Sequence, residues 1–203
     1  MFNALDIPYT PLLHPRLLSE RGKMVIYGGP AVGKSFLVTE LGWQMGVGIT
    51  AFDVYPVEKP IRGLYIQVEV GDYELQERTR AIEALYGPCP NFIIHSIPRF
   101  SIVERQRDVI ETAKLLGLDL LIYDPWYMML DEGENQLQEI RPVLNSIQEV
   151  AAETHTATII LAHTKKETYD KGVVVDIGND ALSGHKGLAN WADTIGRLNG
   201  DAL

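Results

Sequence analysis

The sequence predicts an α/β domain built on a parallel β-sheet with helices on both faces. Short apolar runs with the composition of strands alternate with segments whose apolar residues recur at helical spacing. That alternation is typical of parallel sheets joined by crossover helices. The run at 118–124 is almost wholly apolar, as expected of a central strand that is covered on both sides. Polar residues follow several of these runs, at the strand ends where ligands bind in such sheets.

The expected elements follow one another from residue 24 to residue 199. Residues 1–22, with prolines and mixed polarity, form an N-terminal strap, and 164–187 is irregular and polar. Asp72 is expected to cap one helix, and Pro142 is expected to kink another or to mark its true start. Strands are expected over 24–27, 63–70, 91–96, 118–124, 157–163 and 193–199, and helices over 36–45, 72–86, 103–116 and 136–154.

The composition is that of an ordinary globular protein, with 46% hydrophobic and 22% charged residues in 203. The formal net charge of −9 argues against a surface that coats itself with nucleic acid by bulk attraction, although it is compatible with a local basic loop. Cys89 stands alone, which excludes an intramolecular disulfide and fits a reducing compartment. Without signal-peptide features or an apolar run of membrane-spanning length, the chain is expected to be cytoplasmic.

Residues 28–35 read GGPAVGKS and fit G-x-x-x-x-G-K-[ST], the phosphate-binding loop of P-loop NTPases. An apolar run precedes the motif and a helical pattern follows it, a context that a chance glycine turn lacks. Such a loop aims backbone N–H groups and the positive end of a helix at a polyphosphate. Lys34 is expected to reach the β- and γ-phosphates of ATP, and the Ser35 hydroxyl to hold Mg²⁺. The predicted nucleotide-binding residues here are Gly28, Gly29, Pro30, Ala31, Val32, Gly33, Lys34, Ser35 and Phe36.

Three further polar residues lie at predicted strand ends, and each has a functional and a structural interpretation. Asp124 closes an apolar strand like the Walker B acid that positions Mg²⁺, or it is a solvated acid at a strand end. Glu69 is placed to orient or deprotonate the attacking water, or it is a surface glutamate on the outward face of its strand. His163 is placed to sense the γ-phosphate by hydrogen bonding, or it is a structural histidine.

Taken together, these residues resemble the RecA-like ATPase superfamily within the P-loop fold. The resemblance is strongest to RepA-like hexameric helicases and to RadA- and DnaB-related ATPases. It spans 17–198, so that 1–203 is expected to be one RecA-like domain. The matching segments, in the order of the family, are YGGPAVGKSFL at 27–37, LYIQVEVGDYELQERTRAI at 64–82, LLIYDPWYMMLDEGENQ at 120–136, ILAHTKK at 160–166 and ALSGHKGLANWADTIGRL at 181–198.

The resemblance implies roles for particular residues. Glu69 matches the family's catalytic glutamate, and His163 matches a histidine or glutamine that contacts phosphate, so that Glu69, Lys34 and His163 form the implied catalytic set. Arg78 matches an arginine that lies against adenine in some relatives, whereas taken alone it is a surface helix arginine.

The sequence departs from the family in one segment. Residues 183–185 read Ser-Gly-His where relatives often have Arg-Gly-Ser, whose arginine serves the nucleotide of a neighbouring subunit. Lys186 or Arg197 is available to replace that arginine. The departure puts autonomous helicase activity in doubt.

The stretch 164–187 takes the place of loops that touch single-stranded DNA in relatives. Lys165, Lys166 and Lys186 are candidates for phosphate contacts, and Tyr169 offers a face on which a base can stack. Acidic residues are interleaved among the lysines, so a solvated loop without a DNA role stays an equal alternative.

The resulting prediction is an ATPase that acts with Mg²⁺ on single-stranded DNA in replication, recombination or repair, as a homo-oligomeric ring or filament. A nucleotide-gated regulator with slow hydrolysis is a second hypothesis, favoured by the missing arginine. A P-loop kinase of small molecules is a third, although the sequence has no arginine-rich lid.

Overall fold

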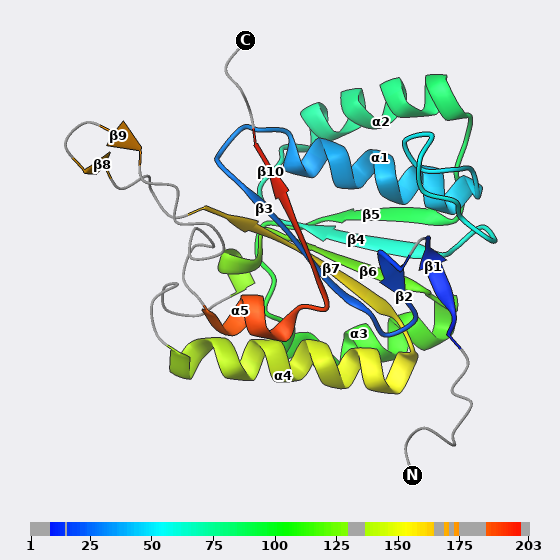
Figure 1. Ribbon diagram of the computed structural model, residues 1–203. Helices are drawn as coiled ribbons and strands as arrows, with labels where there is room; N and C mark the ends of the chain where they lie inside the picture. The colour runs from blue at the N-terminus through cyan, green and yellow to red at the C-terminus, as the bar shows by residue number, and fades with distance from the viewer. Residues whose placement is uncertain are drawn as a thin grey trace.

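A computed structural model describes residues 9–14, 16–129, 137–164, 169–170, 173–174 and 186–199, and its centre is a six-stranded parallel sheet (Figure 1). The strand order across the sheet is β10-β3-β7-β6-β4-β5. Non-consecutive neighbours in this order require crossover connections, as the alternating pattern predicts. The strands are β3 (Lys23–Gly28), β4 (Gly63–Gln67), β5 (Phe92–Ser96), β6 (Leu120–Asp124), β7 (Ala157–His163) and β10 (Thr194–Leu198).

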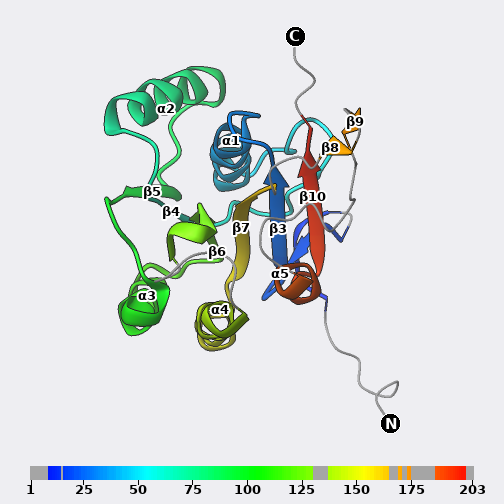
Figure 2. The same cartoon turned by 90° about the vertical axis from the view of Figure 1, so that its left-hand side faces the viewer.

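Helices cover both faces of the sheet, which confirms the predicted fold class (Figure 2). On one face lie α1 (Lys34–Val47) and α2 (Asp72–Tyr86), and on the other lie α3 (Ile102–Leu116), α4 (Leu137–Thr154) and α5 (Lys186–Trp191). Each face has its own apolar core, one formed around Val25, Tyr123 and Ile160 and the other around Ile26, Tyr65 and Ile159. The inner strands contribute to both cores, which explains their nearly continuous apolar sequences.

The parallel register brings several strand ends together at one edge. Gly28 of β3 is paired with His163 of β7 and with Leu198 of β10, while Gln67 of β4 is paired with Asp124 of β6. Because all six strands run in the same direction, these residues share the carboxyl edge of the sheet. The polar groups that follow the strands therefore lie along one edge, although they are far apart in sequence.

Several boundaries differ from the sequence predictions. The N-cap of α2 is Gly71, and Asp72 is the first helical residue rather than the cap. Pro142 lies inside α4 and so does not mark its start. β4 ends at Gln67 instead of 70, because the Gln67 side chain accepts the N–H groups of Glu69 and Val70.

The structure also contains short elements that the sequence analysis missed. They are the antiparallel pairs β1 (Pro11–Leu13) with β2 (Leu18–Ser19) and β8 (Tyr169–Asp170) with β9 (Val173–Val174), the 3₁₀ turn η2 (Trp126–Met129) and the helix α5. All are too short to produce a clear periodic pattern. Within the part of the chain that the structure describes, no helix has the length and apolarity needed to cross a membrane.

Helix α1 is enclosed on two sides, because it contacts both the sheet and α2. Gly42 and Gly46 allow this close packing. A Cβ atom on Gly42 would lie 2.3 Å from Phe92 Cε2, and one on Gly46 would lie 2.5 Å from Cys89 Sγ. The two glycines therefore have a packing role in the helix that follows the phosphate loop.

Gly42→Ala is expected to destabilise the protein although alanine is the better helix former. The helix gains about 1 kcal/mol from the substitution, but overpacking against the buried Phe92 costs about 1–3 kcal/mol, so the clash prevails. Chemical denaturation measures the difference. Gly196→Ala is the control, because its Cβ would meet Ile26 at 3.8 Å, an ordinary contact. Equal unfolding midpoints for wild type and Gly42→Ala would contradict this account.

Candidate functional site

The candidate site begins with the loop between β3 and α1, where the motif predicts phosphate binding. Gly28 ends β3, and α1 begins at Lys34 with Gly33 as its N-cap. Gly33 has a φ of 92° and Ala31 a φ of 59°, so the loop turns through left-handed conformations. At Gly28 a Cβ would lie 2.4 Å from the carbonyl oxygen of Leu198, so only glycine fits beside β10. The loop is thereby held at the carboxyl edge of the sheet, in front of the helix N-terminus.

Lys34 is buried beneath this loop, with 6% of its surface exposed. Its Nζ donates hydrogen bonds to the carbonyl oxygens of Gly28 at 3.1 Å and Gly29 at 2.7 Å. Burial lowers the pKa of Lys34, while the negative charges of Asp124 and Glu69 oppose that shift. The two carboxylates thus favour the protonated ammonium, the form that binds phosphate.

Asp124 ends β6 and is also buried, with 3% of its surface exposed. The hydroxyl of Tyr65, on the neighbouring strand β4, donates a hydrogen bond of 2.5 Å to Asp124 Oδ2. Burial raises the pKa of Tyr65, Asp124 raises it further, and a hydrogen bond from Ser35 opposes the rise. The tyrosine therefore stays a neutral hydrogen-bond donor. It connects Ser35 and Asp124, the two residues that the sequence predicts to bind Mg²⁺. A hydroxyl and a carboxylate are oxygen ligands of the kind that Mg²⁺ prefers.

Glu69 follows β4, and its side chain is exposed at the carboxyl edge of the sheet. Its charge acts on Lys34, which places the carboxylate near the phosphate loop. The backbone N–H of Glu69 donates to Gln67 Oε1 at 3.1 Å. A solvent-accessible carboxylate with a tethered backbone is suited to accept a proton from water.

His163 ends β7 between the phosphate loop and the turn after β6. Its Nδ1 lies 3.5 Å from Lys34 Nζ, within hydrogen-bonding reach when that nitrogen is unprotonated. Its ring meets Tyr127 edge to face, with the centroids 5.4 Å apart. The structure therefore brings His163 together with Lys34 beside the phosphate loop.

The remaining predicted residues are Arg78, the other residues of the phosphate loop, and Arg197. Arg78 is ion-paired with Glu74 on α2, and its charge still acts on Tyr65. Pro30, Ala31, Gly33 and Phe36 are exposed, whereas Gly29, Val32 and Ser35 are partly buried. Arg197 is exposed on the edge strand β10.

The nucleic-acid candidates are described only in part. Lys165 and Lys166 lie outside the described residues. Tyr169 lies in β8 and Lys186 begins α5, but their side chains are not among those described.

The sequence analysis missed Tyr65 and Gln67 as members of the site. Both are buried, Tyr65 at 1% and Gln67 at 0% exposed, and both carry polar groups near the carboxyl end of β4. A buried polar side chain needs a partner, so such residues in a strand covered on both faces point to a site. The apolar strand pattern was visible, but nothing in the sequence showed that Asp124 lies next to β4.

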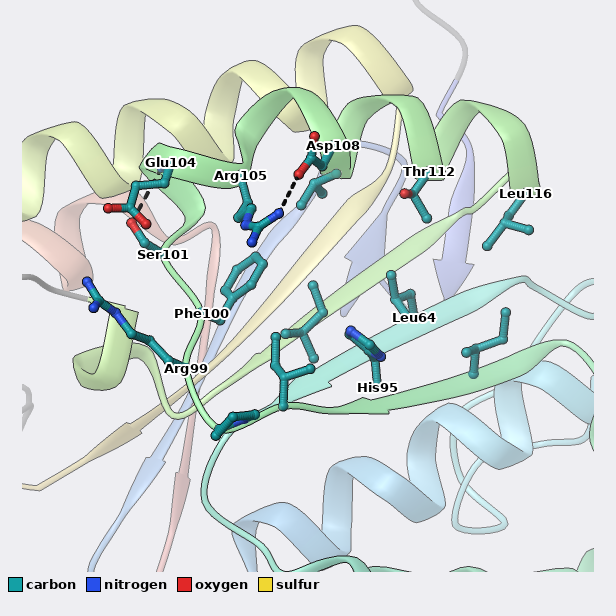
Figure 3. A pocket seen from close by; sticks show the side chains of 15 residues that line it. Leu64, His95, Arg99, Phe100, Ser101, Glu104, Arg105, Asp108, Thr112 and Leu116 are labelled. Carbon is teal, nitrogen blue, oxygen red and sulfur yellow. Dashed lines mark hydrogen bonds and ion pairs between the residues drawn. The ribbon is translucent and has the colours of Figure 1, made fainter.

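A cavity of about 750 Å³ lies elsewhere, between β5 and α3 (Figure 3). Its floor is apolar, with Leu64, Ile66 and Phe100 among the residues that line it. Arg105 and Asp108 form an ion pair at 3.0 Å on the α3 side. No residue of the phosphate loop lines it, so this cavity is separate from the candidate nucleotide site.

The comparisons with known proteins agree with this fold. A family model described as "AAA domain" matches residues 2–169. A KaiC-like protein from the hyperthermophilic archaeon Pyrococcus horikoshii OT3 has 14% sequence identity and a TM-score of 0.59, over 90% of this chain and 75% of that one. The RadB recombinase has 16% identity and a TM-score of 0.57, over 92% of this chain and 78% of that one. None of the curated protein sequences is a significant match. The predicted RecA-like P-loop fold is thus confirmed.

Proposed function

The chain belongs to the AAA domain family, and on that premise we propose that it hydrolyses ATP with Mg²⁺ at the carboxyl edge of its sheet. The observation that carries the proposal is the position of Lys34. Its ammonium group is buried at the phosphate loop, donates hydrogen bonds to loop carbonyls, lies close to His163, and interacts with the charges of Asp124 and Glu69. These are the groups that phosphoryl transfer requires: a cation for the phosphates, a metal-positioning acid and a base.

Each residue has a separate part in the proposed reaction. The loop N–H groups and Lys34 bind the β- and γ-phosphates, and Lys34 stabilises the charge that develops on them. Ser35 and Asp124 would hold Mg²⁺, and the bound metal would neutralise phosphate charge. Tyr65 holds Asp124 through Oδ2 and leaves the carboxylate a second oxygen for the metal. Glu69 orients the attacking water and accepts its proton.

His163 and Arg78 extend the site in the same proposal. His163 contacts the γ-phosphate side of the nucleotide through its position beside Lys34. Arg78, whose charge reaches Tyr65, lies against the base after giving up its ion pair with Glu74. Both roles come from the resemblance to RecA-like ATPases and are supported by the location of the residues.

We further propose that residues 1–203 work as one ATPase domain in a homo-oligomer that engages single-stranded DNA. One structural neighbour, RadB, is a recombinase, which supports this choice of partner. The candidate contacts are Lys165, Lys166, Tyr169 and Lys186, in the stretch that follows the phosphate-contacting His163. Because the chain has a net charge of −9, a monomer has little general attraction for DNA, and several copies of the loop in one assembly would add their contacts.

The test is ATP turnover with Mg²⁺, measured with and without a single-stranded oligonucleotide over a range of protein concentrations. The proposal expects turnover that depends on Mg²⁺, rises with protein concentration and is stimulated by the oligonucleotide. Slow turnover that DNA leaves unchanged would favour the nucleotide-gated regulator, which Ser183-Gly184-His185 in place of the family arginine also favours. No hydrolysis under any condition would refute the ATPase.

DNA engagement is expected to show as a salt-dependent affinity. Each phosphate that a lysine neutralises contributes about −0.7 to the slope of log affinity against log salt on single strands. Replacing Lys165 and Lys166 with alanine is therefore expected to flatten the slope while ATP affinity is unchanged. Fluorescent oligonucleotide binding in the presence of ATP measures the slope. The charge-matched control is the double variant Lys59→Ala/Lys114→Ala, which also removes two positive charges, at exposed positions. An unchanged slope would remove this stretch from the mechanism.

A further inference from the structure

Gln67 is a buried polar residue at the centre of the carboxyl edge of the sheet. It is the last residue of β4 and is 0% exposed. In the parallel register it is paired with Asp124 of β6 on one side and with Ser96 of β5 on the other. An amide in such a place is costly unless all its hydrogen bonds are made.

The side-chain amide of Gln67 makes four hydrogen bonds. Oε1 accepts the backbone N–H of Glu69 at 3.1 Å and that of Val70 at 2.7 Å. Nε2 donates to the carbonyl oxygen of Val70 at 2.9 Å and to Ser96 Oγ at 2.6 Å. Two acceptor positions and two donors are the full capacity of an amide. The Gln67 side chain therefore supplies hydrogen-bond partners for the backbone of Glu69 and Val70 and connects this turn to Ser96 of β5.

The Gln67 amide takes the place of backbone pairing at Glu69 and Val70, while the N–H of Val68 still donates to the carbonyl oxygen of Asp124. Residues 68–70 belong to neither a strand nor a helix, and α2 begins only at Asp72. The backbone of Glu69 is bonded to Gln67, while the Glu69 side chain remains exposed and free to reach substrate. Through this bond Gln67 limits where the Glu69 carboxylate can lie.

We infer that Gln67 is the positioning residue for Glu69: it holds the 68–70 turn so that the carboxylate is aimed at the attacking water. The inference rests on the proposed function, since it needs Glu69 to be the base. Gln67 acts on Glu69 and does not itself contact the nucleotide in this proposal. The phosphate loop and Lys34 belong to β3 and α1, so nucleotide affinity should not depend on Gln67. A misplacement of about 1 Å in a reacting group can cost roughly 10²-fold in rate.

The experiment compares Gln67→Met, which keeps the length of the side chain and removes its amide, with wild type. We expect kcat for ATP to fall by about 10- to 100-fold, the Kd for ATP to stay within about twofold, and the amide protons of Glu69 and Val70 to exchange faster with solvent. Gln44→Met is the matched control. Gln44 is also buried, and its Oε1 accepts the N–H of Phe52, but it lies on α1 away from Glu69. This control should lose stability and keep its kcat.

The same substitution in a Glu69→Gln background separates positioning from a merely structural role. If Gln67 acts through Glu69, Gln67→Met should lower kcat in wild type and cause no further loss where the base is already absent. Equal losses in both backgrounds, or a wild-type kcat for Gln67→Met while Glu69→Gln is slow, would overturn the inference and leave the proposed function standing. Wild-type turnover of Glu69→Gln itself would instead overturn the role of Glu69 and the inference with it.

Gln67→Glu covers the case in which Gln67→Met does not fold. It keeps both acceptor positions for the N–H groups of Glu69 and Val70 and loses the two donors. If the bonds to those N–H groups carry the role, Gln67→Glu should retain slow exchange of the two amide protons. Fast exchange in a folded Gln67→Glu protein would show that the acceptors do not hold the turn and would contradict the inference.

Discussion

Lys34→Ala is expected to weaken ATP binding by roughly 10²-fold or more. The substitution removes the buried ammonium that lies at the phosphate loop, within 3.1 Å of the carbonyl oxygens of Gly28 and Gly29. Charge-assisted hydrogen bonds contribute about 1.5–3 kcal/mol each, and 2.8 kcal/mol is roughly a 10²-fold change in Kd. No other lysine or arginine of the described residues lies in the phosphate loop to take its place. Isothermal titration calorimetry with ATP and Mg²⁺ measures the affinity.

Lys23→Ala is the matched control for this prediction. Lys23 starts the same strand, β3, at the opposite edge of the sheet, where it is ion-paired with Asp193 at 3.6 Å. Its removal changes the net charge by the same amount, so it accounts for any general electrostatic effect. Its ATP affinity should equal that of wild type. Equal ATP affinity of Lys34→Ala and wild type would mean that this loop is not the phosphate site.

Glu69→Gln is expected to lower ATP turnover by about 10²-fold or more while ATP binding persists. The amide keeps the shape of the side chain but cannot accept a proton from water, and general base catalysis contributes about 10²- to 10⁴-fold. The backbone bond from Glu69 to Gln67 is unaffected by the change, so the turn should keep its conformation. Single-turnover kinetics at saturating ATP measure the chemical step apart from binding.

Glu77→Gln is the control for the loss of a negative charge beside the site. Glu77 lies on α2 and is ion-paired with Arg80 on the exposed face of that helix. Because a surface ion pair of this kind contributes little to stability, the variant should behave as wild type in both turnover and binding. If Glu69→Gln turned over ATP like Glu77→Gln, Glu69 would be a surface residue, which is the structural interpretation of the sequence.

Much of the fold followed from local patterns. Helix α2 covers 72–86 and strand β7 covers 157–163, as their apolar patterns predict. A helix with one buried face has apolar residues at helical spacing, whereas a strand that is buried on both faces is a nearly continuous apolar run. Boundaries failed where a side chain replaced backbone pairing, as Gln67 does after β4, or where an element was too short for a period, as in α5. The phosphate loop was predictable because all its residues are contiguous in sequence.

The sequence by itself determined the phosphate loop, the polar residues that end the strands and the α/β class of this protein, because contiguous residues or short periods encode each of them. Only the tertiary structure decided which strand ends are neighbours. β4 lies between β6 and β5, so Tyr65 reaches Asp124 and Gln67 reaches Ser96, across 59 and 29 residues of sequence. Strand order is set by how crossover helices bury their apolar faces on the whole sheet, and no local pattern carries that information. The partners of a buried hydroxyl or amide could therefore be identified only once the sheet was assembled.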